Sequence, residues 1–202
     1  GYMGSTGLRE TEYFLSDCCC DSADVSPYFT ERLLRLPHSH FCYEPLQPMP
    51  AVQENPPCRK DGRVTFGCFN NFAKVTDEML QLWSEILGRV PGSQLLLKHK
   101  LFSSAEGRSY TQRRLEKAHI DLERVQLQGF STDYLAMYKN IDLALDTYPY
   151  TGGLTTCEAL YMGVPVISRY GARHGSRVGY SLLMNLGLGE LAAPNAQSYV
   201  ER

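Results

Sequence analysis

The chain has 202 residues, 43% of them hydrophobic, and its 20 basic and 22 acidic residues give a formal net charge of −2. This length and composition fit one large globular domain, or one domain with part of another, and the balanced charge argues against a general nucleic-acid-binding protein. No apolar run approaches the roughly 18 residues of a membrane-spanning helix and no signal peptide is visible, so we expect no membrane partner.

The seven cysteines include a consecutive run from Cys18 to Cys20. An odd number without CxxC-like spacing argues against a zinc site and against a disulfide framework. We therefore expect no metal site and a reducing, cytoplasmic location, or a nucleocytoplasmic one in a eukaryote. Cys68 and Cys157 lie in apolar segments, so we expect them to act as small buried hydrophobic residues.

The first 44 residues are poorly patterned for a complete domain. Residues 1–7 form a loop rich in glycine and hydroxyl groups, and short strands are expected at 11–15 and 41–43. Apolar residues at helical spacing predict a helix over 25–36, which Pro37 would end. Residues 45–57 contain five prolines in a mostly polar context, which predicts an interdomain linker.

From residue 62 onward, short apolar strands alternate with helices. We expect strands at 64–69, 95–97, 125–127, 141–145 and 164–167, and helices at 77–90, 106–119, 131–139, 154–162 and 176–186. Thr76 and Ser131 are the expected N-caps of the first and third helices. Five β-α repeats with short connections predict a Rossmann-like α/β fold, with a doubly wound parallel sheet covered by helices on both faces.

The segment from Leu145 to Pro165 is expected to run from a strand end, through a glycine loop, into a helix. Gly152 and Gly153 would allow positive φ and would leave no Cβ in the way of a ligand. The helix N-terminus favours a phosphate, and Glu158, one turn further, could accept hydrogen bonds from ribose hydroxyls. These features predict a nucleoside diphosphate site. The alternative is an ordinary turn in which Thr155 or Thr156 caps the helix.

Ligands of such sheets bind outside the carboxyl ends of the strands. The loops at that edge are expected at 70–74, 98–103, 128–134, 146–156 and 168–177. They carry a set rich in phosphate donors, with one aromatic residue: Lys74, Tyr134, Thr155, Thr156, Glu158, His174 and Arg177. The GxGxxG pattern of dinucleotide-binding dehydrogenases is absent from the sequence, so NAD is not the favoured ligand.

Several motifs, in order and at matching spacing, carry a family resemblance. They are FGCFNNFAK (66–74), LDTYPY (145–150), TTCE (155–158) and YMGVP (161–165), preceded by GYMGSTG (1–7), Tyr13 and Asp17. Together they resemble the carboxyl-terminal catalytic lobe of the O-GlcNAc transferase and SPINDLY family. The likeness covers nearly the whole chain and is closer to SPINDLY-like and bacterial members than to the animal transferase.

The resemblance implies a GT-B glycosyltransferase that is inverting, needs no metal or other cofactor, and transfers a sugar to Ser or Thr of a protein. Residues 1–44 would end the first catalytic lobe, 45–61 would be the linker, and 62–202 would be the nucleotide-sugar-binding lobe, incomplete at its C-terminus. Members usually carry tetratricopeptide repeats before these lobes. The likeness lacks most of the first lobe, including the family's histidine near the acceptor, so we expect a fragment that is inactive alone.

The resemblance also implies roles for individual residues. Lys74 matches the family lysine that contacts the donor diphosphate, and it is the expected catalytic residue. The expected donor-binding residues are Asn71, Ser131, Tyr134, Gly152, Gly153, Thr155, Thr156, Glu158, His174 and Arg177. Tyr134 departs from the family, since relatives place a base-stacking histidine there; tyrosine can also stack. Other readings are an exposed loop lysine for Lys74, a cap for Asn71 and a surface salt bridge for Glu158.

Three readings of the function stay open at this point. We favour transfer of GlcNAc from UDP-GlcNAc to protein, and GDP-fucose is the alternative donor. A second class is another GT-B sugar-nucleotide enzyme, such as an epimerase or a lipid-directed transferase, against which the combined motif spacing argues. The third is a degenerate, non-catalytic lobe that binds nucleotide or serves as a scaffold.

Overall fold

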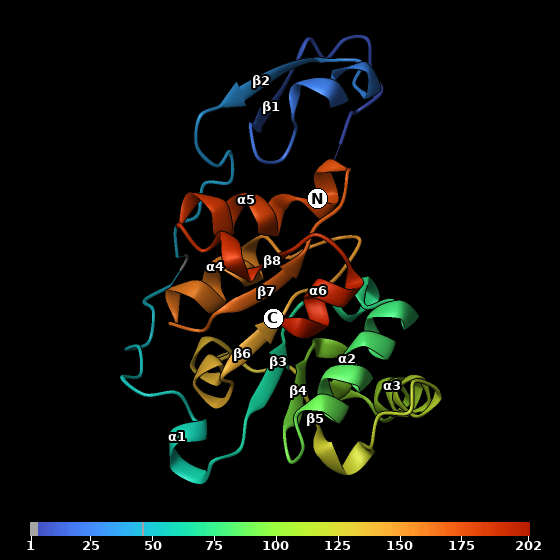
Figure 1. The fold of residues 1–202 in the computed structure, drawn as a ribbon, viewed down its shortest axis with the longest axis vertical. Helices are drawn as coiled ribbons and strands as arrows, with labels where there is room; N and C mark the ends of the chain where they lie inside the picture. The colour runs from blue at the N-terminus through green and yellow to red at the C-terminus, as the bar shows by residue number, and fades with distance from the viewer. Residues whose placement is uncertain (1–3, 46) are drawn as a thin grey trace.

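A computed structural model describes residues 4–45 and 47–202, so the predicted glycine loop at 1–7 lies partly outside the described residues. Two parallel sheets are present (Figure 1). The strands are β1 (Tyr13–Asp17), β2 (Arg32–Leu36), β3 (Thr65–Cys68), β4 (Gln94–Lys98), β5 (Val125–Gln128), β6 (Leu143–Leu145), β7 (Val166–Arg169) and β8 (Ala192–Ala193). The α-helices are α1 (Cys58–Asp61), α2 (Asp77–Arg89), α3 (Ala105–Lys117), α4 (Leu154–Tyr161), α5 (Val178–Asn185) and α6 (Ala196–Glu201).

Short 3₁₀ helices connect these elements. They are η1 (Ala23–Tyr28), η2 (Phe72–Lys74), η3 (Lys100–Ser103), η4 (Leu122–Arg124), η5 (Leu135–Asn140), η6 (His174–Ser176) and η7 (Gly189–Leu191). None of the helices in the part of the chain that the structure describes is long and apolar enough to span a membrane.

The N-terminal unit is a two-stranded parallel sheet, drawn in blue at one end of the molecule in Figure 1. The helix predicted over 25–36 is wrong, because this segment forms the short helix η1 and then β2. Pro27 lies inside η1, and β2 alternates between exposed and half-buried residues, which is a strand period rather than a helical one. The strand predicted at 41–43 is wrong as well, since those residues carry no regular structure.

The second sheet has the order β5-β4-β3-β6-β7-β8, and every pair in it is parallel. Counted along the chain within this sheet, the order is 3-2-1-4-5-6, the Rossmann arrangement. The chain order therefore reverses between β3 and β6. The carboxyl ends of these two strands flank the position where such sheets bind ligands.

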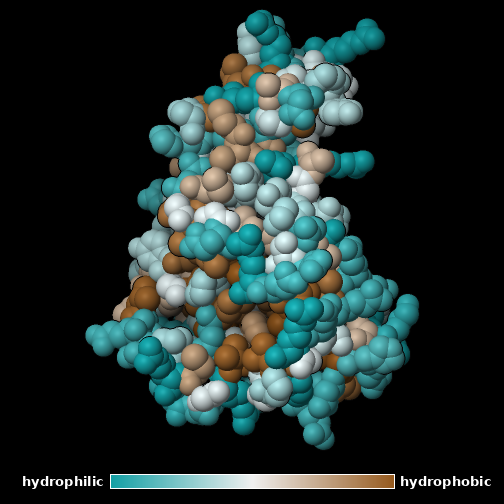
Figure 2. All heavy atoms as spheres, viewed as in Figure 1, coloured by the Kyte–Doolittle hydropathy of each residue, from teal (hydrophilic) through white to brown (hydrophobic). Residues whose placement is uncertain are grey.

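Helices cover both faces of this sheet, as the sequence predicts for a doubly wound fold. Along β4, Leu95 and Leu97 join one buried cluster while Leu96 joins another, because successive side chains of a strand point to opposite faces. The first cluster packs under α2, α3 and α6, and the second under η5 and α4. In Figure 2 hydrophobic residues gather in the middle of the visible face, whereas the outer helix α3 is mostly hydrophilic.

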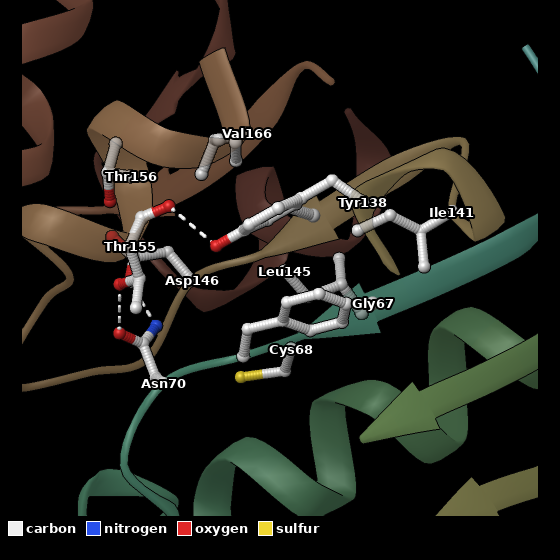
Figure 3. Close-up of a pocket in the computed structure, with 13 residues that line it drawn as sticks. Gly67, Cys68, Asn70, Tyr138, Ile141, Leu145, Asp146, Thr155, Thr156 and Val166 are labelled. Carbon is white, nitrogen blue, oxygen red and sulfur yellow. Dashed lines mark hydrogen bonds between the residues drawn. The ribbon is translucent and has the colours of Figure 1, made fainter. Parts of the chain in front are cut away.

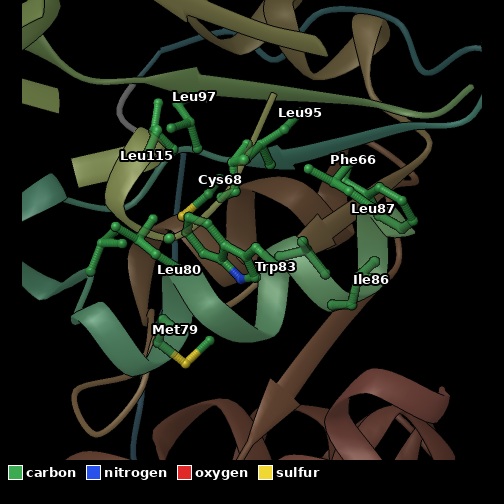
Figure 4. Packing of buried hydrophobic residues seen from close by; sticks show 14 of the residues in the cluster. Phe66, Cys68, Met79, Leu80, Trp83, Ile86, Leu87, Leu95, Leu97 and Leu115 are labelled. Atoms are coloured by element: carbon green, nitrogen blue, oxygen red, sulfur yellow. The ribbon is translucent and has the colours of Figure 1, made fainter. Parts of the chain in front are cut away.

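Helix α2 supplies much of the first cluster. Thr76 caps it as predicted, since its side chain accepts a hydrogen bond from the Met79 amide (3.2 Å). Trp83 is fully buried against the strands (Figure 4). Its indole Nε1 donates to the Tyr199 hydroxyl (3.1 Å), and that hydroxyl donates to the Asp146 carbonyl (2.9 Å). The core is thereby linked to the end of β6 by hydrogen bonds as well as by packing.

Most predicted elements after residue 62 agree with the structure within a few residues. The sequence pattern does not predict β8 and α6, which end the chain. The predicted N-cap at Ser131 is wrong, because η5 begins at Leu135 and has no side-chain cap. The predicted burial of Cys68 is confirmed, while Cys157 is half-buried, and all seven cysteines are free.

Candidate functional site

Asp146, the residue that follows β6, is the centre of the hydrogen-bond network at the switch point. One carboxylate oxygen accepts from Asn70 Nδ2 (3.0 Å), from the Gly152 amide (2.7 Å) and from the Thr147 amide (2.8 Å). The other accepts from the Ser168 hydroxyl (2.6 Å). Burial raises the pKa of Asp146, and these donors oppose that shift. This buried side chain fixes the ends of β3 and β7 and the glycine loop relative to one another.

The loop glycines have negative or extended φ, so the predicted positive φ at Gly152 and Gly153 is wrong. That the missing Cβ atoms make room for a ligand stays a prediction, because in the structure a Cβ at either glycine would meet the protein itself. A Cβ on Gly152 would lie 2.5 Å from Thr156 Oγ1, and one on Gly153 would lie 2.8 Å from the Phe41 ring. The loop is therefore packed tightly between β3 and the N-terminal segment.

Lys74 ends the loop that follows β3 and reaches across to the glycine loop. Its ammonium donates to the Thr151 carbonyl (3.0 Å) and lies 4.0 Å from the centre of the Tyr150 ring. No ion pair among the described residues includes Lys74. Burial lowers the pKa of Lys74 below its usual value. A half-buried cation held by a carbonyl and a ring is well placed to bind an anion that enters at this edge.

Helix α4 begins at Leu154, next to Lys74 and Asp146, and its N-cap is Gly153 without a side-chain cap. The capping alternative for Thr155 and Thr156 is therefore wrong. The Thr155 hydroxyl instead donates to Asn70 Oδ1 (2.6 Å), and Thr156 is buried (Figure 3). The first turn of α4 is thus tied to the end of β3, and its free backbone amides face the carboxyl edge of the sheet.

Glu158 lies one turn further along α4 and is buried. Its carboxylate accepts from the Tyr134 hydroxyl (2.5 Å) and, more weakly, from the Tyr138 hydroxyl (3.5 Å). Burial raises the pKa of Glu158, and both hydrogen bonds oppose this shift. The surface salt bridge considered for Glu158 is therefore wrong, because tyrosines and not cations are its partners.

A pocket of about 240 Å³ opens beside Glu158. Its walls come from η5, from the start of α4 and from the segment after β2: Tyr43, Glu44, Pro45, Gln47, Met49, Tyr134, Leu135, Leu154 and Glu158. Two carboxylates, of Glu44 and Glu158, and several aromatic or apolar side chains suit a nucleoside, whose base stacks and whose ribose donates hydrogen bonds. The cavity shown in Figure 3 is a separate and much smaller one. Its volume is about 10 Å³, so it holds at most one water molecule, and the residues that line it pack closely beneath the glycine loop.

The structure does not place every predicted site residue beside Lys74 and Glu158. Asn71 is exposed, and its side chain caps η2 by accepting from the Ala73 amide (3.0 Å). Ser131 is half-buried in the loop after β5. Arg177 donates to the carbonyls of Cys19 (2.8 Å) and Gly171 (2.9 Å), so it ties the N-terminal segment to the lobe.

His174 is buried and bonded to Asp21 of the N-terminal segment through its Nδ1 (2.5 Å). It therefore lies at the junction of the two sheets, with a partner that its own loop does not supply. Its role toward the donor, like that of Arg177, stays a prediction.

Sequence reasoning missed several residues that build the site. Asp146 and Asn70 lie within the recognised motifs but have no predicted role, although Asp146 directly follows β6 and Asn70 lies two residues after the end of β3, the strands that flank the switch point. Their position at adjacent carboxyl ends was the available signal. Tyr138 and Tyr43 gave no such signal, because their place beside Glu158 depends on the folded chain.

Comparisons with known proteins agree with this architecture. The model of Glycosyl transferase family 41 matches residues 57–202. The whole chain is 41% identical to a probable UDP-N-acetylglucosamine–peptide N-acetylglucosaminyltransferase SPINDLY of Arabidopsis thaliana and covers 22% of it. The SPINDLY protein of Petunia hybrida is 40% identical over the same span, again with 22% of its length covered.

Among solved structures, a mutant O-GlcNAc transferase of Thermobaculum terrenum superposes with a TM-score of 0.90 and 35% identity. The match covers 99% of this chain and 38% of that one. The chain therefore spans about a fifth of its curated relatives. The predicted α/β, doubly wound fold of a GT-B lobe is confirmed.

Proposed function

The chain belongs to glycosyl transferase family 41, and from this premise we propose that it forms the donor-binding lobe of a protein O-glycosyltransferase. The enzyme would transfer N-acetylglucosamine from UDP-GlcNAc to Ser or Thr of an acceptor protein, in the cytoplasm. Two observations on relatives support this donor: the names of the SPINDLY proteins specify UDP-N-acetylglucosamine and a peptide acceptor, and the similar solved structure is an O-GlcNAc transferase.

The main support for the proposal is that three groups lie at the carboxyl edge of the sheet, beside the nucleoside-sized pocket. They are the half-buried ammonium of Lys74, the free amides at the N-terminus of α4 and the buried carboxylate of Glu158. Lys74 and the first turn of α4 present positive charge for a diphosphate. Glu158 presents acceptors for ribose hydroxyls. This order of groups along the edge matches the order of phosphate, ribose and base in a nucleotide.

In the proposed reaction the acceptor hydroxyl attacks the anomeric carbon from the face opposite the nucleotide, the bond from that carbon to the diphosphate breaks with inversion, and the hydroxyl proton passes to solvent. Negative charge then grows on the departing diphosphate. Lys74, held in place by Thr151 and Tyr150, lies where it can stabilise this charge. We propose that no metal ion is needed at the diphosphate, because Lys74 and the α4 amides take that place.

The base would stack on Tyr134. Members of the family that the chain resembles carry a histidine at this position. In the unliganded arrangement the Tyr134 hydroxyl is bonded to Glu158. A ribose that bonds to Glu158 would compete with this hydroxyl, so Tyr134 would be released as the nucleotide enters. The ring of Tyr134 is then free to turn onto the base.

The test of the proposed function is a transfer assay with the full-length protein. It is incubated with a mixture of candidate acceptor proteins and either UDP-GlcNAc or GDP-fucose, and the products are analysed by mass spectrometry. We expect a HexNAc mass increment on Ser or Thr with UDP-GlcNAc only. A deoxyhexose increment with GDP-fucose alone would replace the donor, and no increment with either would support the degenerate-lobe reading.

Replacing Glu158 with alanine is expected to weaken nucleotide binding by ~1–3 kcal/mol, because two ribose hydroxyls lose a buried acceptor. The measurement is calorimetric titration with UDP. Glu116→Ala is the matched control, since Glu116 is exposed on α3 away from the pocket. Equal affinities in wild type and Glu158→Ala would remove Glu158 from the site.

The affinity for UDP is also expected to fall as the pH falls through the raised pKa of Glu158. Burial raises the pKa of Glu158, so this carboxylate takes up its proton at a higher pH than an exposed glutamate does. The protonated form accepts ribose hydroxyls poorly, so binding is strongest above the raised pKa and weakens as the pH falls through it. UDP itself gains a proton near pH ~6. Protonation of UDP affects binding to the wild type and to Glu158→Gln equally, so it cancels in the ratio of their affinities. A ratio that does not change with pH would contradict the prediction.

A further inference from the structure

Three side chains with metal-binding atoms meet where the N-terminal segment contacts the nucleotide-binding lobe. They are Cys20, His40 and His174, and one ligand atom of each lies within 4.8 Å of the other two. Cys20 is fully buried, His174 is 4% exposed, and the side chain of His40 is 16% exposed. Cys20 follows β1 and His40 follows β2 in the N-terminal segment, and His174 comes from η6 of the lobe.

Each histidine is held by a buried carboxylate. His40 Nδ1 bonds to Asp17 Oδ2 (2.6 Å), and His174 Nδ1 bonds to Asp21 Oδ2 (2.5 Å). The other nitrogen of each ring, Nε2, is therefore the one available to a metal. Metal-binding histidines almost always have this arrangement, in which the second nitrogen donates to a carboxylate or carbonyl and so fixes the tautomer and the ring orientation.

The carboxylates are themselves fixed by further hydrogen bonds. Asp17 accepts from the Cys20 amide (2.7 Å) and from the Ser181 hydroxyl (2.9 Å). Asp21 accepts from the Ser16 hydroxyl (2.5 Å). Both carboxylates are 1% exposed, so their negative charge is buried and requires a nearby positive charge. A divalent cation bound among the thiol and the two imidazoles would supply it.

We propose that Cys20, His40 and His174 bind one Zn²⁺ ion, which clamps the N-terminal segment to the nucleotide-binding lobe. One thiolate and two imidazoles are zinc ligands of the usual kinds, and the exposed edge at His40 leaves room for a water molecule as the fourth ligand. In a tetrahedral site the ligand atoms lie about 3.5 Å apart, and here they lie within 4.8 Å of one another, so the side chains close by at most about 1.3 Å on binding. This differs from the expectation based on cysteine spacing, because the three ligands are far apart in the sequence.

The site is structural, and it is linked to Lys74 through the chain. Next to His174, the Gly175 carbonyl accepts from the Thr151 amide (3.1 Å), and the Thr151 carbonyl accepts from Lys74 (3.0 Å). A metal at His174 would therefore order the segment that positions the lysine, without contact with the reacting atoms.

The experiment is titration of the metal-free purified protein with Co²⁺, a spectroscopic substitute for Zn²⁺, followed by competition with Zn²⁺. We expect one Co²⁺ per chain, with a thiolate-to-cobalt charge-transfer band that Zn²⁺ abolishes. The band should be lost in Cys20→Ser and kept in Cys18→Ser, whose residue is the exposed neighbour in the same cysteine run. His174→Gln should also lose binding, whereas His38→Gln, at an exposed histidine, should keep it.

The Asp21→Asn variant distinguishes a metal site from simple packing. It removes the negative charge of the side chain that holds His174 but keeps its shape. It should weaken Co²⁺ binding by ~10–100-fold, as loss of the carboxylate behind a ligating histidine does. Circular dichroism of the metal-free variants tests that each still folds. The proposal is overturned if folded wild-type protein binds no Co²⁺ or Zn²⁺, or if the Cys20→Ser and Cys18→Ser proteins bind equally well.

Discussion

Replacing Lys74 with alanine is expected to lower the rate of sugar transfer by ~10²-fold or more, by analogy with the loss of one fixed donor to transition-state charge. The ammonium is half-buried, forms no ion pair among the described residues and is held at Thr151 and Tyr150. In the proposed reaction it would thus be preorganised for charge that develops on the leaving diphosphate. The measurement is the transfer rate of the full-length protein at saturating donor.

Lys117→Ala is the matched control, since the Lys117 side chain is 80% exposed on α3. It should transfer sugar at the wild-type rate. UDP affinity separates a transition-state role of Lys74 from simple binding, because a transition-state role lowers the rate more than the affinity. A Lys74→Ala protein with an unchanged transfer rate would contradict the catalytic assignment.

Replacing Asp146 with alanine is expected to destabilise the protein by about 3–5 kcal/mol and to abolish nucleotide binding. The substitution leaves the Asn70 amide, the Ser168 hydroxyl and two backbone amides without their buried acceptor. For a domain of this size the loss corresponds to a Tm lower by roughly 10 °C. Thermal unfolding followed by circular dichroism measures it.

Asp133→Ala is the control, because Asp133 is exposed in the loop after β5, at the same edge of the sheet. A change within ~0.5 kcal/mol is expected there. An Asp146→Ala protein that unfolds at the wild-type temperature would contradict this prediction. The hydrogen bonds of Asp146 would then not be what fixes the glycine loop to the strand ends.

The sheet could be predicted from the sequence because its signals are local. The apolar runs of β3, β4 and β6 and the cap, acidic first turn and apolar face of α2 each lie within one segment. Alternation of helices and strands then restricts the sheet to a parallel, doubly wound one. The last elements, β8 and α6, were missed because two-residue and six-residue elements carry too little periodicity.

The segment at 25–36 was misassigned because its charged and apolar residues fit two periods. The pairing of β2 with β1, which decides the outcome, is a contact between distant residues. The reason for the two loop glycines was also mispredicted. The sequence suggests that Gly152 and Gly153 allow positive φ and make room for a ligand, whereas in the structure close contacts with Thr156 and Phe41 leave no space for a Cβ. The sequence identifies the positions at which a side chain is excluded, and the folded structure shows which neighbouring atoms exclude it.

The candidate site could be predicted in part. Lys74 and Thr155 lie at the same edge of the sheet because Lys74 is in the loop after β3 and Thr155 is in the first turn of α4, and Glu158 lies one turn further along that helix. The partners that tune them could not be predicted. Tyr134 on Glu158, and Asp21 on His174, are tertiary contacts between residues 24 and 153 positions apart.

We propose that the carboxyl edge of the sheet, from Lys74 to Glu158, binds a nucleoside diphosphate. Calorimetric titration of the full-length protein with UDP and with GDP, at matched concentration and salt, measures this binding. We expect one UDP per chain, with affinity reduced in Glu158→Ala and unchanged in Glu116→Ala. Binding of GDP alone would keep the site and change the donor. Binding of neither nucleotide would contradict the claim.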